Sequence, residues 1–197
     1  MSVNFHLESP FEKYISKKIA GMSKSGWVVS EDDTGFSPDT ALYMPDFVDY
    51  LKATAPEKVE KMQKQFGSNW ESNLEKKLVH SLEVDGTVNT LRNGFSMAGY
   101  QTIVCSGHYP DDPRVKSVKA FYDANILRVM HQVHYQTAGK KSLDLVFFIN
   151  GIPVATAEVK TEFTQTVEDA ILEYQTERKP IEPGTNRKNY LLMFVVR

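Results

Sequence analysis

The chain has 197 residues, of which 41% are hydrophobic and 24% charged, a composition typical of a globular protein. Its 23 Lys and Arg against 25 Asp and Glu give a formal net charge of −2, which excludes a protein that holds nucleic acid by bulk charge alone. Cys105 is the only cysteine, which excludes an intramolecular disulfide and fits a reducing, cytoplasmic compartment. No apolar run reaches the ~18 residues of a membrane span, and the first residues lack the apolar core of a signal peptide.

The first half of the chain is predicted to be mainly helical. Helical spacing of apolar residues predicts a helix over 10–22, and a short strand is expected over 26–30. Between residues 40 and 85 we expect a layer of helices inserted between the first helix and the sheet, broken before Pro56. Its last helix is indicated by apolar residues that recur every four positions: Trp70, Leu74, Leu78 and Leu82.

From residue 127 the apolar pattern changes to the period of two that is typical of strands. Before it, residues 100–105 are strand-like and 115–126 are predicted to be helical. Strands are predicted over 127–135, 142–149, 152–160 and 190–197, and a helix over 165–178. Asn150-Gly151 is a strong hairpin signal. The second half of the chain is therefore predicted to be an α/β unit.

Three charged residues, Asp144, Glu158 and Lys160, interrupt predicted strands that are otherwise apolar, where an unpaired charge is costly. Two carboxylates on neighbouring strands can hold Mg²⁺, which prefers a few hard oxygen ligands and keeps several waters. The ammonium of Lys160 shares the strand face of Glu158 and can orient a metal-bound water. This combination favours phosphodiester hydrolysis, because the metal lowers the pKa of the water and neutralises charge on the phosphate.

The register of the hairpin at Asn150-Gly151 decides whether these groups meet. A plain two-residue turn would set Asp144 opposite Ala157 and point Glu158 to the other face. A three-residue loop, with its glycine in the left-handed position of a G1 bulge, would set Asp144 opposite Thr156 and bring Glu158 to the same face. The metal site therefore predicts an odd loop or a bulge. An exposed sheet face with alternating charges, the alternative that stays open, needs neither.

These segments resemble the N-terminal nuclease region of the R subunits of type I restriction–modification enzymes, which belong to the PD-(D/E)xK nuclease superfamily. The segments that carry the resemblance are SLDLVFFINGIPVATAEVK (142–160), TQTVEDAILEYQTER (164–178) and YLLMFVVR (190–197). Similar segments upstream are FEKYISKKI (11–19), LRNGF (91–95) and NILRVMHQVHY (125–135).

The resemblance implies a restriction-endonuclease-like mixed β-sheet flanked by helices, in a single domain over 1–197. The helical insertion would span about 40–85, and the catalytic sheet and helix about 127–197. By the same resemblance Asp144, Glu158 and Lys160 are catalytic. Mg²⁺, for which Mn²⁺ can substitute, would be held by Asp144, Glu158 and the backbone carbonyl of Val159.

Three further residues are supporting candidates by the same resemblance. An acidic residue on the first helix often assists in this superfamily, which makes Glu12 the candidate; a solvated helix residue is the alternative. Many type I nuclease domains carry a Gln-x3-Tyr motif on the helix after Glu-x-Lys. This chain lacks it, and Tyr174 with Gln175 can cover part of the role, although Tyr174 can equally be a core residue.

The implied activity is hydrolysis of double-stranded DNA within a complex that also holds modification and specificity subunits. R subunits are ATP-driven, yet the chain contains no G-x4-G-K-[ST] phosphate loop. We therefore expect the chain to be an N-terminal fragment, with the ATP-binding motor beyond Arg197. The alternatives are a stand-alone repair or defence nuclease of the same superfamily, and a non-catalytic docking or DNA-binding module with a nuclease fold.

Overall fold

The computed structural model describes residues 8–22, 26–112, 114–136, 139–159, 167–176, 178–181 and 186–195. Its elements, in chain order, are α1 (Glu8–Met22), β1 (Val28–Ser30), α2 (Met44–Thr54), α3 (Pro56–Phe66), the 3-10 turn η1 (Gly67–Asn69), α4 (Trp70–Asp85), α5 (Thr87–Asn93), β2 (Phe95–Met97), β3 (Tyr100–Ile103), α6 (Lys116–Asp123), β4 (Leu127–His134), β5 (Ser142–Ile149), β6 (Ile152–Ala157), α7 (Val167–Thr176) and α8 (Tyr190–Val195). Among the helices in these ranges, none has both the length and the apolar character that crossing a bilayer requires.

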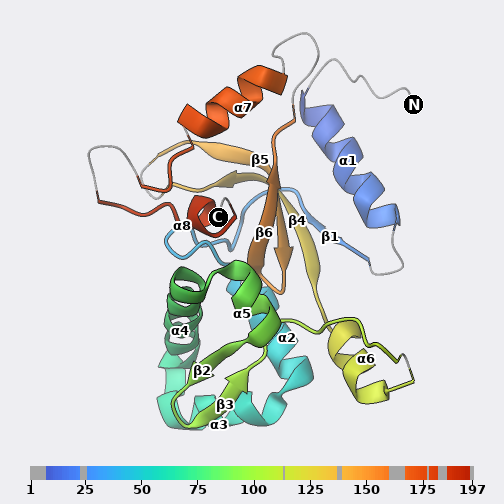
Figure 1. The fold of residues 1–197 in the computed structure, drawn as a ribbon, viewed down its shortest axis with the longest axis vertical. Coiled ribbons are helices and arrows are strands. Elements are labelled where there is room, and N and C mark those ends of the chain that lie inside the picture. Colours follow the sequence, from blue (N-terminus) through green and yellow to red (C-terminus); the bar gives the residue numbers. More distant parts are fainter. Residues whose placement is uncertain are drawn as a thin grey trace.

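A mixed sheet with helices on both faces forms the centre of the molecule (Figure 1). The described strands of this sheet run in the order β1-β4-β5-β6, with β1 parallel to β4 and the other neighbours antiparallel. Helix α1 covers one face through Phe11 and Ile15, which pack on a small apolar cluster of the sheet. Helix α8 covers the other face, where the main core continues into the helices below. The molecule is therefore the predicted α/β type, a mixed sheet flanked by helices.

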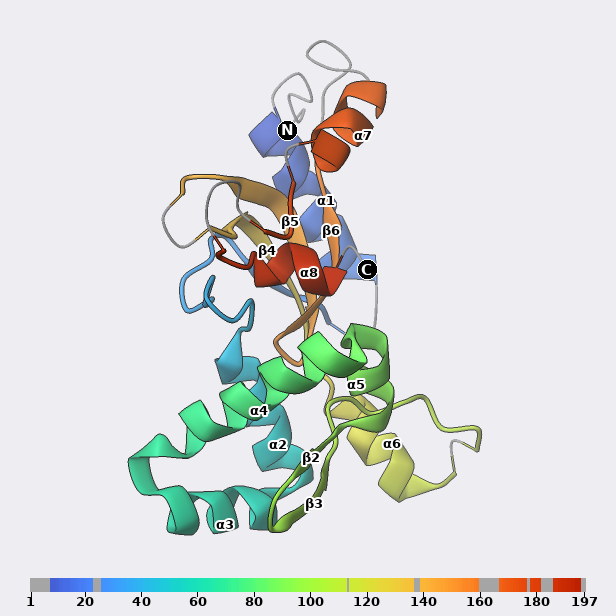
Figure 2. The ribbon, with the colours of Figure 1, turned by 60° about the vertical axis from the view of Figure 1, so that its left-hand side comes forward.

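Three α-helices, α2 to α4, occupy residues 44–85, where the sequence predicts a helical layer. They lie below the sheet together with α5 and the small antiparallel pair β2-β3 (Figures 1 and 2). The apolar residues at every fourth position of α4 are all buried, as their spacing predicts. Helix α5 is not predicted by the sequence analysis, because it is short, mostly polar and enclosed by Gly86 and Gly94, both at positive φ.

Two predictions about the end of the sheet are wrong. Residues 190–195 form helix α8 and not a strand; Leu191, Leu192 and Phe194 are buried against the core. A short run that is apolar at almost every position has neither period, so the pattern cannot separate a buried strand from a buried helix. Strand β6 also ends at Ala157, three residues earlier than predicted.

The hairpin between β5 and β6 has a two-residue turn and a bulge. Asn150 and Gly151 both have positive φ, 50° and 74°, as a type I′ turn requires, and Ile149 pairs with Ile152. The three-residue loop, one of the two predicted ways to the required register, is therefore not formed. The register shifts one step further on, between Phe147 and Phe148, which confirms the predicted bulge and the positive φ of the glycine.

The tip of this hairpin is buried in the molecule. The Asn150 side chain is fully buried; its Nδ2 donates to the Cys105 carbonyl at 2.8 Å, and its Oδ1 accepts from the Ile126 amide at 2.7 Å. The carbonyl of Gly151 accepts from the Tyr43 amide at 2.9 Å, at the start of α2. The Gly151 carbonyl thus joins the turn to the helical layer, the Asn150 side chain holds the turn to the segments after β3 and before β4, and no room is left for a larger residue at Gly151.

A second link between the sheet and the helical layer is a buried ion pair. Arg128 of β4 donates from Nε and Nη2 to the two carboxylate oxygens of Asp46 in α2, both at 2.7 Å. The guanidinium also lies over the Tyr43 ring and donates to Ser30. Its hydrogen bonds to Asp46 raise the pKa of Arg128, so the guanidinium stays charged.

We expect Gly151→Ala to lower the free energy of unfolding by at least about 2 kcal/mol. A Cβ there would lie 2.0 Å from the Tyr43 carbonyl oxygen, at a backbone φ of 74°. Gly99→Ala is the matched control: φ is 82° and nothing lies within 4 Å, so only the backbone strain of ~1 kcal/mol applies. Urea unfolding followed by circular dichroism measures both, and equal losses would contradict the docked turn.

Candidate active site

Asp144 lies near the start of β5, and both of its carboxylate oxygens accept hydrogen bonds. The Val159 amide donates to Oδ2 at 2.7 Å, and Nε2 of Gln132 donates to Oδ1 at 3.2 Å. Asp144 is half-buried, whereas Gln132 is exposed, so the site is open to solvent on this side. The carboxylate is therefore held in one orientation while it remains accessible.

Glu158 follows directly after the last residue of β6. The last pair of the ladder is Leu145 with Ala157, and one further step in the same register would set Glu158 opposite Asp144. Residues directly opposite on antiparallel strands share a face of the sheet. The bulge thus gives the register that the metal-site hypothesis needs, with Glu158 and not Thr156 as the expected partner of Asp144, and the meeting of the two carboxylates stays a prediction.

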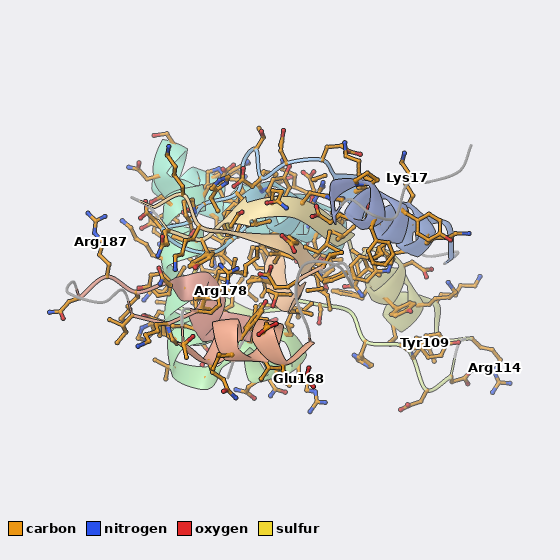
Figure 3. The ribbon with its side chains drawn as sticks, turned by 90° about the horizontal axis from the view of Figure 1, so that it is seen from above. Lys17, Tyr109, Arg114, Glu168, Arg178 and Arg187 are labelled. Carbon is orange, nitrogen blue, oxygen red and sulfur yellow. The ribbon has the colours of Figure 1, made fainter. Side chains whose placement is uncertain are left out.

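Arg178, which comes soon after α7, is an unpredicted neighbour of this pair. Its Nη2 lies 3.0 Å from a carboxylate oxygen of Glu158, and the two side chains are only 7% and 6% exposed. Its Nη1 donates to the Tyr135 hydroxyl and to the Ser142 carbonyl, both at 3.1 Å. Figure 3 shows Arg178 in the packed centre of the molecule beside α7, whereas Arg114 extends from the outer rim.

Tyr174 brings α7 over the two carboxylates. Its hydroxyl lies 2.9 Å from Oγ1 of Thr156. Burial raises the pKa of Tyr174, and the negative charges of Glu158 and Asp144 raise it further, so both carboxylates lie within electrostatic reach of one hydroxyl. Its ring also packs on the main core, which confirms the core interpretation, while its role in the site stays a prediction. Gln175 is exposed.

Glu12 of α1 is buried, at 5% exposure, and is not the solvated helix residue of the alternative interpretation. Both of its carboxylate oxygens lie 3.3 Å from Nε2 of Gln132, which also donates to Asp144. Its Oε2 lies 3.8 Å from Nδ1 of the buried His131. The structure therefore connects Glu12 to Asp144 through a single amide group.

Two parts of the predicted site stay predictions. Lys160 lies outside the described residues. The Val159 amide contacts Asp144, but the predicted role of the Val159 carbonyl as a metal ligand is not tested by that contact. Within the described ranges, no group of three or more His, Cys, Asp or Glu side chains is arranged to hold a metal.

Gln132 and Arg178 are the site residues that the sequence does not reveal. Arg178 stands at the end of a predicted helix, where a cation is ordinary because it complements the helix dipole. Gln132 stands in a strand whose alternation gives no reason to single it out. To single out either residue from the sequence would have required knowledge of its partner. Glu158 lies 20 residues from Arg178, and Glu12 lies 120 residues from Gln132.

A comparison with protein families matches residues 43–196 to the type I restriction enzyme R protein N terminus. The chain belongs to this family. Residues 1–42, which include α1 and Glu12, lie outside the matched range. Neither a curated protein nor a solved structure matches the chain. Membership identifies the chain as an N-terminal module of a type I restriction enzyme R protein, a family whose name indicates a nuclease role.

In this restriction enzyme domain we expect Arg178→Ala to lower the free energy of unfolding by about 3 kcal/mol, because it removes one member of a buried ion pair. Arg114→Ala is the matched control: that arginine also contacts a carboxylate, Asp112, but its side chain is 90% exposed, so no measurable change is expected. The midpoints of urea unfolding compare the two. A similar, small effect of both changes would show that Arg178 does not support the site.

Proposed function

We propose that this domain is a metal-dependent endonuclease that hydrolyses phosphodiesters of double-stranded DNA within a type I restriction enzyme. The observation that carries the proposal is the bulged register of the β5–β6 hairpin, which ends at the pair of Leu145 with Ala157 and would place Glu158 opposite Asp144 at the next step. Two carboxylates at one point of a sheet, in a member of a restriction enzyme family, fit this chemistry better than an exposed face of alternating charges. The buried pairing of Glu158 also argues against that alternative.

The residues present fit Mg²⁺, with Mn²⁺ as a substitute. Asp144, Glu158 and the Val159 carbonyl would offer hard oxygen ligands, and Mg²⁺ commonly binds through one or two carboxylates while it keeps several waters. When bound, the metal would lower the pKa of a water and neutralise charge on the phosphate. Hydrogen bonds from Gln132 and the Val159 amide hold Asp144 in place, and Arg178 fixes the direction of Glu158.

Lys160 follows Glu158 by two residues, and its ammonium would orient the attacking water or balance charge on the phosphate. Glu12 and Tyr174 support the site from two different elements, since each reaches the neighbourhood of Asp144. The remaining partners are part of the same proposal: modification and specificity subunits, and an ATP-driven motor, in the cytoplasm. The domain itself would supply the cutting step.

We expect Asp144→Asn and Lys160→Ala each to lower DNA cleavage by the assembled enzyme at least 10²-fold, about 3 kcal/mol in the barrier, with ATP hydrolysis unchanged. The first removes a metal-binding charge and the second the group that acts on the water. Removal of divalent metal with EDTA should stop cleavage, and Mn²⁺ should restore it. A supercoiled plasmid assay beside an ATPase assay measures both activities.

The control variants are Asp49→Asn and Lys52→Ala, which change an exposed ion pair of α2 away from the sheet and should leave cleavage unchanged. Undiminished cutting by the Asp144 variant would remove the proposed nuclease site. A joint loss of cutting and ATP hydrolysis would point to a structural role of these strands in place of a catalytic one.

A further inference from the structure

Gln132 has a backbone conformation that is unusual inside a strand. Its φ is 49°, in the left-handed region, although it stands between His131 and Val133 in β4. The two neighbours pair with β5, but no pair is recorded for Gln132 itself. Left-handed backbone is costly for a residue with a side chain, and such strain persists only where the surrounding structure imposes it.

This conformation coincides with a change of the sheet faces. Before it, Val129 of β4 and Leu145 of β5 belong to the apolar cluster under α1. After it, Val133 and its partner Leu143 belong to the main core on the other face. Gln132 therefore stands where the strand pair changes face, at the position from which a side chain reaches both α1 and the start of β5.

The side-chain amide of Gln132 uses both of its ends. Nε2 lies 3.3 Å from each carboxylate oxygen of Glu12 and 3.2 Å from Oδ1 of Asp144. Oε1 accepts a hydrogen bond from the Ser142 hydroxyl at 3.0 Å. Ionised carboxylates only accept hydrogen bonds, so the nitrogen and not the oxygen must face them. The two carboxylates thus set the orientation of the amide, and the Ser142 hydroxyl supports it.

We propose that Gln132 is a positioning residue, which directs the carboxylates of Glu12 and Asp144 toward one point so that Asp144 is ready to bind the metal. The inference rests on the proposed function and extends it to a residue on a different strand. Two carboxylates that approach the same atom repel each other. A neutral group with two N–H donors compensates this repulsion and adds no positive charge that would repel the metal. Partners that orient a metal-binding group in this way typically change metal affinity 10- to 100-fold when they are removed.

The strained backbone offers a way to separate this role from a purely structural one. Gln132→Ala removes the amide and keeps the strain, whereas Gln132→Gly removes the amide and relieves the strain, because glycine adopts positive φ freely. If Gln132 only supported the fold, stability and metal affinity would change together. If it positions Asp144, both variants lose metal affinity to the same extent, although relief of the strain makes the glycine variant melt at a higher temperature than the alanine variant.

The experiment is calorimetric titration of MnCl₂ into the chain, beside thermal melting without metal. We expect Kd for Mn²⁺ to rise 10- to 100-fold in Gln132→Ala and Gln132→Gly, and to rise less in Ser142→Ala, which only releases the orientation of the amide. The matched control is Gln101→Ala, an exposed glutamine of β3 in the lower sheet, which should bind Mn²⁺ as wild type does.

Wild-type affinity in both Gln132 variants would overturn the inference and leave the proposed nuclease standing. A loss of affinity in Gln132→Ala that Gln132→Gly restores would also overturn it, because the effect would then come from the backbone. If the wild-type chain binds no Mn²⁺, while Asp144→Asn leaves DNA cleavage unchanged, the proposed function fails and the inference falls with it.

Discussion

One extra residue in a β-hairpin sets the register of Asp144 against the strand that leads to Glu158. Phe148 pairs with Pro153 and Phe147 with Ala155, so Val154 is the residue without a counterpart. Without this bulge the two-residue turn would set Asp144 opposite Ala157 and direct Glu158 to the face under α1. Two contacts follow from that single shift of register: that of Glu158 with Arg178 and that of Asp144 with the Val159 amide.

The acidic groups of the site are compensated by the protein itself. Glu158 has a guanidinium, Asp144 a backbone amide and a side-chain amide, and Glu12 the same side-chain amide. Burial of such groups without donors would cost several kcal/mol, roughly the margin by which a domain is stable. Ser142 connects the two halves, since its hydroxyl contacts Gln132 and its carbonyl contacts Arg178. The site is thus preorganised by neutral and cationic donors that come from distant parts of the chain.

The sequence predicts those features that depend on local pattern or composition. Period-two alternation locates β4 and β5, and the fourfold spacing from Trp70 to Leu82 locates α4. The charges of Asp144 and Glu158 stand out because their strands are otherwise apolar. The position of the bulge, the helical form of 190–195 and the roles of Gln132 and Arg178 depend on contacts between distant segments, and no local pattern reports such contacts.

The turn at Asn150-Gly151 should not tolerate insertions, unlike the tips of most hairpins. Exposed tips of hairpins are the places where proteins accept added residues, tags or breaks in the chain. Here the asparagine is fully enclosed and the glycine carbonyl bonds to Tyr43. A lengthened turn would separate the sheet from the helical layer and disturb the strands that carry the carboxylates. Related chains should therefore vary in length elsewhere, and a reporter group placed at this turn would itself disturb the domain.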